Sequence, residues 1–126
     1  MLLQKIHHVA LIVSDYQAAR HFYVDLLELP VIRENYRPER GDWKLDLQAG
    51  EIELEIFGVQ NPPKRVTNPE ACGLRHLAFH VEDIEPAVAW LTELGIETEP
   101  IREDLVNGGR FTFFKDPDGL PLEIHE

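Results

Sequence analysis

The chain has 126 residues, 44% of them hydrophobic, and a net charge of −11 at pH 7. This length and composition predict one compact domain with a buried core. The acidic balance argues against binding to nucleic acid or to anionic membranes, because such surfaces need clustered Lys and Arg. No apolar run is long enough to span a membrane. Histidines interrupt the N-terminal apolar stretch, so no signal peptide is expected. Cys72 is the only cysteine, which fits a reducing cytoplasm.

The first half of the chain predicts a helix between a leading strand and three following strands. Residues 7–13 are β-branched and apolar, as is typical of a strand. Ser14 or Asp15 can cap the helix, whose apolar residues recur three and four positions apart until Pro30 ends it. The patterns of apolar side chains predict the other strands at residues 31–36, 43–47 and 52–57.

The second half predicts the same order of elements. Residues 58–73 contain three prolines, two glycines and several charges, which indicates a linker. A strand, a helix capped by Asp83, an extended segment and two strands follow at residues 74–81, 84–94, 96–103, 110–115 and 120–125. We therefore expect an α+β fold of two β-α-β-β-β modules, at about residues 5–57 and 74–126, within a single domain spanning 1–126.

A repeat with an offset of 68 residues supports this duplication. Leu54-Glu55-Ile56 returns as Leu122-Glu123-Ile124, and the same shift carries His8 onto His76. Because side chains alternate across a strand, each Glu lies opposite its flanking Leu and Ile. Each module thus presents one His and one Glu on the face that its helix leaves open.

These four side chains predict a metal site. A single His or Glu on a strand is usually structural, but a matched set of four is not expected by chance. If the mixed sheets curve into a cup, with the helices on the outer face, then His8, Glu55, His76 and Glu123 can converge. A pair of carboxylates on an inner face needs a positive partner. Two imidazoles and two carboxylates suit a first-row divalent metal, either as tetrahedral zinc or with two positions open for substrate oxygens.

Several motifs resemble the vicinal-oxygen-chelate superfamily, and most closely its glyoxalase I-like branch. They are HHVALIVSDY, LEIF, GLRHLAFHVED and RFTFFKDPDGLPLEI, and the likeness runs from about residue 7 to 126. The resemblance implies that the modules surround one metal held by His8, Glu55, His76 and Glu123. It also implies Ni or Co as the preferred metal, with Zn, Mn or Fe as alternatives, and a homodimer.

The resemblance further implies a lyase or isomerase acting on a small 2-oxo or 2-hydroxy carbonyl compound or its thiol adduct. The metal would stabilise the ene-diolate formed by proton transfer, with Glu123 as the first candidate for the base and Glu55 as the second. Glutathione or another thiol is a possible cosubstrate. However, Ile12 and Val59 replace the Arg and Asn with which glyoxalase I holds glutathione.

Other activities of the superfamily stay open. Epimerases, thiol transferases and dioxygenases resemble the chain, but Glu55 is a fourth ligand that these enzymes replace or lack. A non-catalytic binding protein would not need the metal ligands. His80, Arg37 and Arg110 are candidate substrate contacts, with Arg75 expected on the other sheet face. Trp43 and Phe113 are predicted to be core residues.

Overall fold

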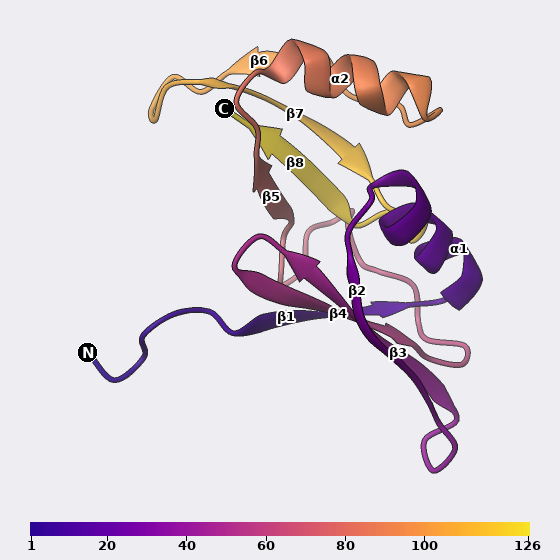
Figure 1. Cartoon of the computed structure of the whole chain (residues 1–126). Coiled ribbons are helices and arrows are strands. Elements are labelled where there is room, and N and C mark those ends of the chain that lie inside the picture. Colours follow the sequence, from indigo (N-terminus) through magenta and orange to yellow (C-terminus); the bar gives the residue numbers. More distant parts are fainter. The chain divides into compact units, whose positions relative to one another are not determined.

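The computed structural model describes all 126 residues and divides into two compact units, residues 1–64 and 65–126. Each unit contains a helical segment and a four-stranded mixed sheet, so the predicted pair of β-α-β-β-β modules is confirmed (Figure 1). None of the helices combines the length and the apolar character that a membrane crossing requires.

The first unit is built on a sheet with the strand order β1-β4-β3-β2. Strand β1 (His8–Val13) runs parallel to β4 (Ile52–Gly58), which pairs antiparallel with β3 (Asp42–Ala49) and so leads to β2 (Val31–Arg37). Helix α1 (Tyr16–Arg20) begins at Asp15, whose carboxylate accepts a hydrogen bond from the Ala18 backbone N–H. It continues as the π-helical segment η1 (His21–Leu26), which the sequence pattern does not predict.

The second unit repeats this topology with the strand order β5-β8-β7-β6. Strand β5 (Leu77–His80) runs parallel to β8 (Pro121–His125), and β7 (Arg110–Lys115) joins β8 to the short edge strand β6 (Arg102–Glu103). Helix α2 (Ile84–Glu93) is capped by Asp83 and ends before Gly95, whose φ of +79° suits the predicted helix terminus.

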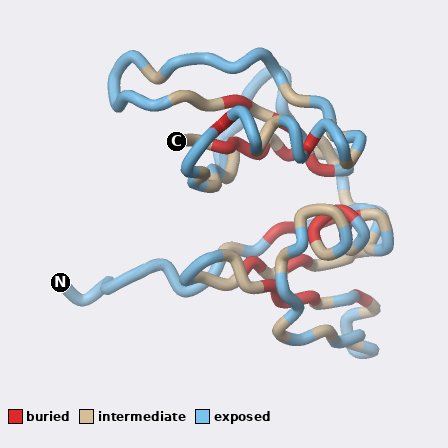
Figure 2. Tube along the Cα trace, turned by 45° about the horizontal axis from the view of Figure 1, so that its top comes forward, coloured by how far each residue is buried: buried red, intermediate tan, exposed pale blue.

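The core of each unit lies between its helix and one face of its sheet. In Figure 2 the buried positions follow the strands and the inner sides of the helices. Leu54 and Ile56 are almost fully buried, as are Leu122 and Ile124 in the second unit. Because side chains alternate along a strand, Glu55 and Glu123 each point to the face of their own sheet that lies opposite these buried residues. The repeat therefore places its acidic residues on open faces, as expected.

Two expectations about the fold are wrong in detail. Residues 96–101 are not a strand, because this segment bonds to β7 only through Glu99, whose backbone meets Phe113 and Thr112. Trp43 is not a core residue, since it remains 37% exposed near the start of β3, where it packs edge-on against Tyr16.

Glu126 joins α2 to β7. Its carboxylate accepts hydrogen bonds from the backbone N–H of Ile84 at 3.0 Å and from Arg110 at 2.9 Å. The Arg110 guanidinium and these backbone donors lower the pKa of Glu126 from 4.5 to about 2. A lowered pKa means that the contribution to stability is complete above pH 4.5 and is lost as the pH falls through about 2.

We therefore predict that Glu126→Gln destabilises the protein at pH 7 and that its difference from wild type shrinks between pH 4.5 and 2. Urea unfolding of both proteins at pH 7 and at pH 2 measures this difference in stability, with Glu51→Gln in an exposed turn as the matched control. A difference that is equally large at pH 2 would contradict the role of the Glu126 charge.

Candidate metal centre

The first unit brings His8 and Glu55 together on its open sheet face. The parallel register of β1 and β4 sets Ala10 opposite Glu55 and His8 opposite Glu53, so His8 and Glu55 are diagonal neighbours. His8 Nε2 lies 3.7 Å from Glu55 Oε1. The small Ala10 side chain leaves the space between them open.

The second unit repeats this arrangement. Ala78 lies opposite Glu123 in the β5–β8 register, and His76 directly precedes β5. His76 Nε2 lies 3.4 Å from Glu123 Oε2. The two copies of the module therefore reproduce the side-chain pair as well as the backbone.

Both pairs have the spacing of neighbouring metal ligands. Ligand atoms that lie about 2.1 Å from one ion are about 3.0–3.4 Å apart at adjacent tetrahedral or octahedral positions. The His76–Glu123 distance of 3.4 Å lies at the upper end of this range and the His8–Glu55 distance of 3.7 Å lies just above it, and in both pairs Nε2 is the imidazole atom nearer to the carboxylate. Imidazole and carboxylate are also a suitable donor set for first-row divalent metals. Each pair thus fits two ligands of such an ion.

His7 supports the orientation of His8. The Nδ1 atoms of the two rings lie 3.0 Å apart, so one ring donates and the other accepts a hydrogen bond. This contact leaves Nε2 of His8 free to face Glu55. Such partners of a ligating imidazole fix its ring orientation. The only sequence signal for this role is the His-His doublet.

The surroundings of the two carboxylates differ. In the first unit, Asp46 is the β3 neighbour of Glu55, and Lys44 Nζ lies 3.5 Å from Glu55 Oε2. In the second unit the neighbour of Glu123 is Phe113, whose ring packs edge-on against His76 with centroids 5.1 Å apart. Phe113 is therefore a wall of the His76–Glu123 pair. The prediction from the sequence that it is a core residue is wrong.

Asp46, Glu53 and Glu55 form an acidic cluster whose carboxylate oxygens lie within 4.8 Å of one another. Two cations compensate this cluster. Arg33 donates to Asp46 at 2.8 Å and to Glu53 at 2.7 Å, and Lys44 donates to Asp46 at 2.6 Å. Burial raises the pKa of Asp46, but the hydrogen bonds from Lys44 and Arg33 outweigh burial and lower it. We therefore assign no metal to this cluster.

The predicted substrate contacts occupy different places. Arg37 lies over the Phe57 ring, and both of its hydrogen bonds to Asp42 are 2.7 Å long. Arg110 shares the helix-covered face with Phe114 and binds Glu126, so the structure does not bring it to the His76–Glu123 pair. His80 is exposed and faces the same side of its sheet as His76, opposite His125 in the register.

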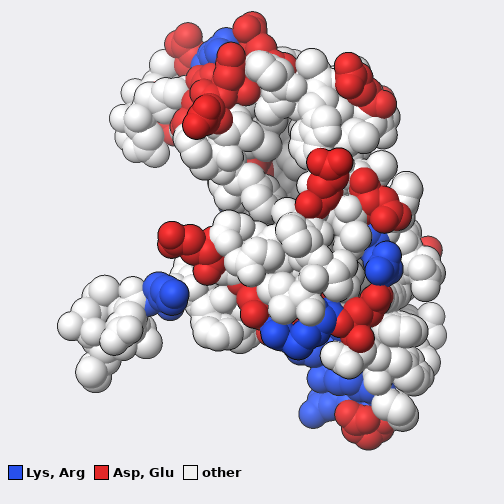
Figure 3. All heavy atoms as spheres, in the orientation of Figure 1, with Lys and Arg blue, Asp and Glu red and all other residues white.

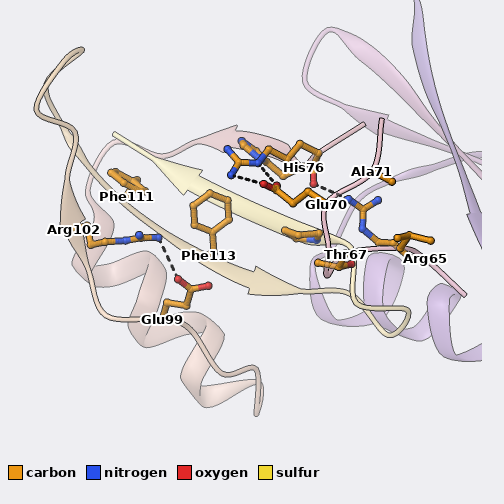
Figure 4. A pocket seen from close by; sticks show the side chains of 12 residues that line it. Arg65, Thr67, Glu70, Ala71, His76, Glu99, Arg102, Phe111 and Phe113 are labelled. Atoms are coloured by element: carbon orange, nitrogen blue, oxygen red, sulfur yellow. Dashed lines mark hydrogen bonds and ion pairs between the residues drawn. The ribbon is translucent and has the colours of Figure 1, made fainter. Parts of the chain in front are cut away.

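A cavity of about 420 Å³ in the second unit opens beside His76. Its walls come from the segment before β5, from the segment before β7 and from β7 itself (Figure 4). The lining includes Arg65, Arg75, Arg102, Phe111 and Phe113. Arg75 reaches it, contrary to simple alternation, because residues 70–75 form a loop and not a strand. Arg65 and Arg102 were not predicted as site residues, and no pattern in the sequence distinguishes them from surface arginines.

Comparison with known proteins supports the assignment of the fold. The sequence matches the Glyoxalase/Bleomycin resistance protein/Dioxygenase superfamily over residues 5–124, and the chain belongs to this family. It is 57% identical to the uncharacterized protein YwkD of Bacillus subtilis (strain 168), covering 100% of the chain and 99% of YwkD. The glyoxalase family protein from Enterococcus faecalis has a solved structure with a TM-score of 0.94 and 58% identity, covering both chains fully.

More distant relatives have varied activities in their names. A 2-epi-5-epi-valiolone epimerase from Actinomyces sp is 29% identical, covering 94% of this chain and 77% of the epimerase. The glutathione transferase FosA of Serratia marcescens is 28% identical, covering 98% and 82%. A lactoylglutathione lyase from Agrobacterium tumefaciens has 26% identity and a TM-score of 0.72, covering 97% and 92%. The comparisons thus establish the superfamily and not the glyoxalase I-like branch.

Asp46 provides a test of the charge balance next to Glu55. It is 1% exposed, so its removal leaves Arg33 and Lys44 without their shared buried partner. We predict that Asp46→Asn lowers the free energy of unfolding by about 2–3 kcal/mol. Chemical denaturation measures the loss, and Asp25→Asn, which breaks only the exposed pair with His21, should change stability by less than about 0.5 kcal/mol. Equal effects of the two substitutions would refute this prediction.

Proposed function

We propose that the protein is a divalent-metal-dependent lyase or isomerase of the lactoylglutathione lyase type. Its four metal ligands are His8, Glu55, His76 and Glu123, and its substrate is a small 2-oxo or 2-hydroxy carbonyl compound or its thiol adduct. The observation that carries this proposal is the repetition of one His–Glu pair, at ligand spacing, in both modules. We also propose that the protein is a cytoplasmic homodimer.

The metal ion would supply Lewis-acid polarisation of two neighbouring substrate oxygens. The chain's own residues then perform the proton transfer. We assign the base to Glu123, because His76 is its only ion-pair partner, whereas Glu55 also faces the Lys44 ammonium. Glu123 accepts the C–H proton of the hydroxyl-bearing carbon and returns it to the former carbonyl carbon, while the hydroxyl proton passes from one oxygen to the other, so the reaction is a net isomerisation.

The walls of the second unit support this role. Glu123 is only 9% exposed, and Phe113 covers it on one side. A partly dry carboxylate holds an abstracted proton away from bulk water, which favours its return to the substrate over exchange. The first unit, with Lys44 and Asp46 beside Glu55, is better suited to hold the metal than to move protons.

The positions that would hold glutathione in a thiol adduct carry apolar side chains in this chain. Ile12 lies exposed on the open face of β1, and Val59 follows β4. Neither can donate the side-chain hydrogen bonds that would hold glutathione at these positions. The epimerase among the relatives favours epimerisation as a second candidate function, since it also requires only proton transfer next to a carbonyl.

Removal of one ligand from either pair tests the metal site. We predict that His8→Ala and His76→Ala each lower the affinity for Ni²⁺, Co²⁺, Zn²⁺ or Mn²⁺ at least tenfold. Metal content after dialysis and calorimetric titration measure this, with the exposed His21→Ala as the control. If only one of the two substitutions weakens binding, the pairs do not share an ion.

Turnover tests the proposed chemistry. We predict that metal-loaded protein isomerises the methylglyoxal–glutathione hemithioacetal or another 2-oxo or 2-hydroxy carbonyl substrate. Glu123→Gln should lower kcat by about 10²–10⁴ while it retains most of the metal. Glu55→Gln should mainly weaken metal binding. Wild-type turnover in Glu123→Gln would remove Glu123 from the role of base.

A further inference from the structure

The cavity beside His76 concentrates positive charge in an acidic part of the chain. Residues 65–126 contain five Lys and Arg and thirteen Asp and Glu. Three of those five cations line this cavity, namely Arg65, Arg75 and Arg102, but only two of the thirteen acids do, namely Glu70 and Glu99. Figure 3 shows that acidic side chains predominate around α2 and β6 on the face drawn there. The positive excess is therefore local to the cavity.

The three arginines differ in how many hydrogen bonds their guanidinium groups donate to other residues. Arg75 binds Glu70 through two nitrogens, at 2.5 Å and 3.3 Å. Arg65 donates to the backbone carbonyls of Leu74 and Arg75, both at 2.9 Å, and so holds the loop before β5. Arg102 gives only one N–H to a carboxylate, that of Glu99, at 3.1 Å. A guanidinium has five N–H donors, so most of the donors of Arg102 face solvent or the cavity.

Two aromatic rings hold Arg102 in place. Its Cζ lies 5.1 Å from the centre of the Phe111 ring and 5.7 Å from that of Phe113. Cation–π contacts of this kind orient a guanidinium without using its N–H donors. Figure 4 shows Arg102 reaching along the sheet toward Phe113. The arrangement thus presents an oriented, largely unpaired hydrogen-bond donor.

Phe113 also links this donor to the His76–Glu123 pair. The His76 and Phe113 rings are 5.1 Å apart and Arg102 Cζ is 5.7 Å from Phe113, so the guanidinium lies at most about 11 Å from the His76 ring. A chain of three to five carbon atoms with an oxyanion at each end covers a gap of this size once the contacts of about 2–3 Å at both ends are included. One small molecule can therefore reach both ends.

We propose that Arg102 is a specificity-determining residue that binds a second, anionic end of the substrate. The substrate class is then a short 2-oxo or 2-hydroxy acid with a distal carboxylate or phosphate. This inference rests on the proposed function, in which the two neighbouring oxygens of the substrate bind at the His76–Glu123 end. The distal oxyanion replaces Glu99 on Arg102, and a bidentate pair with the planar guanidinium is stronger than the single N–H contact it displaces.

The test compares three ligands that share a 2-hydroxy acid end. Lactate has no distal anion, malate adds a carboxylate and 3-phosphoglycerate adds a phosphate. Calorimetric titration into Mn²⁺-loaded protein should show that malate or 3-phosphoglycerate binds roughly tenfold to hundredfold more tightly than lactate. The better of these two ligands identifies the oxyanion.

Variants assign the difference to Arg102. Arg102→Gln should bring the three ligands to similar affinities, and Arg102→Lys, which keeps the charge but not the planar fork, should restore part of the difference. Arg40→Gln removes one positive charge from an exposed turn of the first unit and should change nothing. Equal affinity of all three ligands for wild type, or a difference that survives in Arg102→Gln, would overturn the proposal.

The same comparison on metal-free protein separates this inference from the proposed function. The NMR signals of the Phe111 and Phe113 rings should shift on addition of methylphosphonate or acetate to wild type, but not to Arg102→Gln. Failure to bind metal, with these shifts intact, would reject the proposed function and keep the anion site. Metal binding without any shifts and without ligand discrimination would reject the anion site alone.

Discussion

The parallel pairing of the first and last strands in each module is the constraint on which the site depends. It sets a small Ala opposite the Glu and leaves the His as its diagonal neighbour. The alternation that buries Leu54 and Ile56, or Leu122 and Ile124, beneath a helix also turns Glu55 and Glu123 to the open face. A register shift by one residue would exchange the two sets. Core packing and the placement of the two His–Glu pairs are therefore one requirement, since neither can change without the other.

Duplication gave the two modules the same pair but not the same chemistry around it. On β3, Lys44 and Asp46 lie beside Glu55, whereas Phe113 on β7 lies beside Glu123. An ammonium next to a carboxylate forms an ion pair with it. An aromatic ring excludes water from the carboxylate but forms no ion pair with it. The neighbouring strand, and not the strand that carries the Glu, thus distinguishes the two halves. This gives a physical reason why two nearly symmetric glutamates can perform different tasks.

The sequence was sufficient for the modules, the helix cap at Asp83 and the faces of the two glutamates, and it limited the other cap to Ser14 or Asp15, because all of these follow from local patterns and from the 68-residue repeat. It was not sufficient for Phe113. An aromatic residue in an alternating strand suits either face, and only the β7–β8 register identifies its neighbours. The sequence also could not place Arg65, Arg75 and Arg102 around one cavity, since the segment before β5 brings the first two there and the two-residue edge strand β6 brings the third.

The sequence does not show which charges meet in space, and for this reason net charge is a poor guide to what this protein binds. A charge of −11 repels anions at long range, but the interaction is screened within about 8–10 Å at physiological ionic strength. Inside a cavity the nearest groups dominate, and there three arginines face two glutamates. An acidic surface with a locally positive cavity selects among anions, because only those small enough to enter reach the favourable field. Large polyanions meet the acidic exterior first, which reconciles the predicted absence of nucleic-acid binding with the proposed preference for a small anionic substrate.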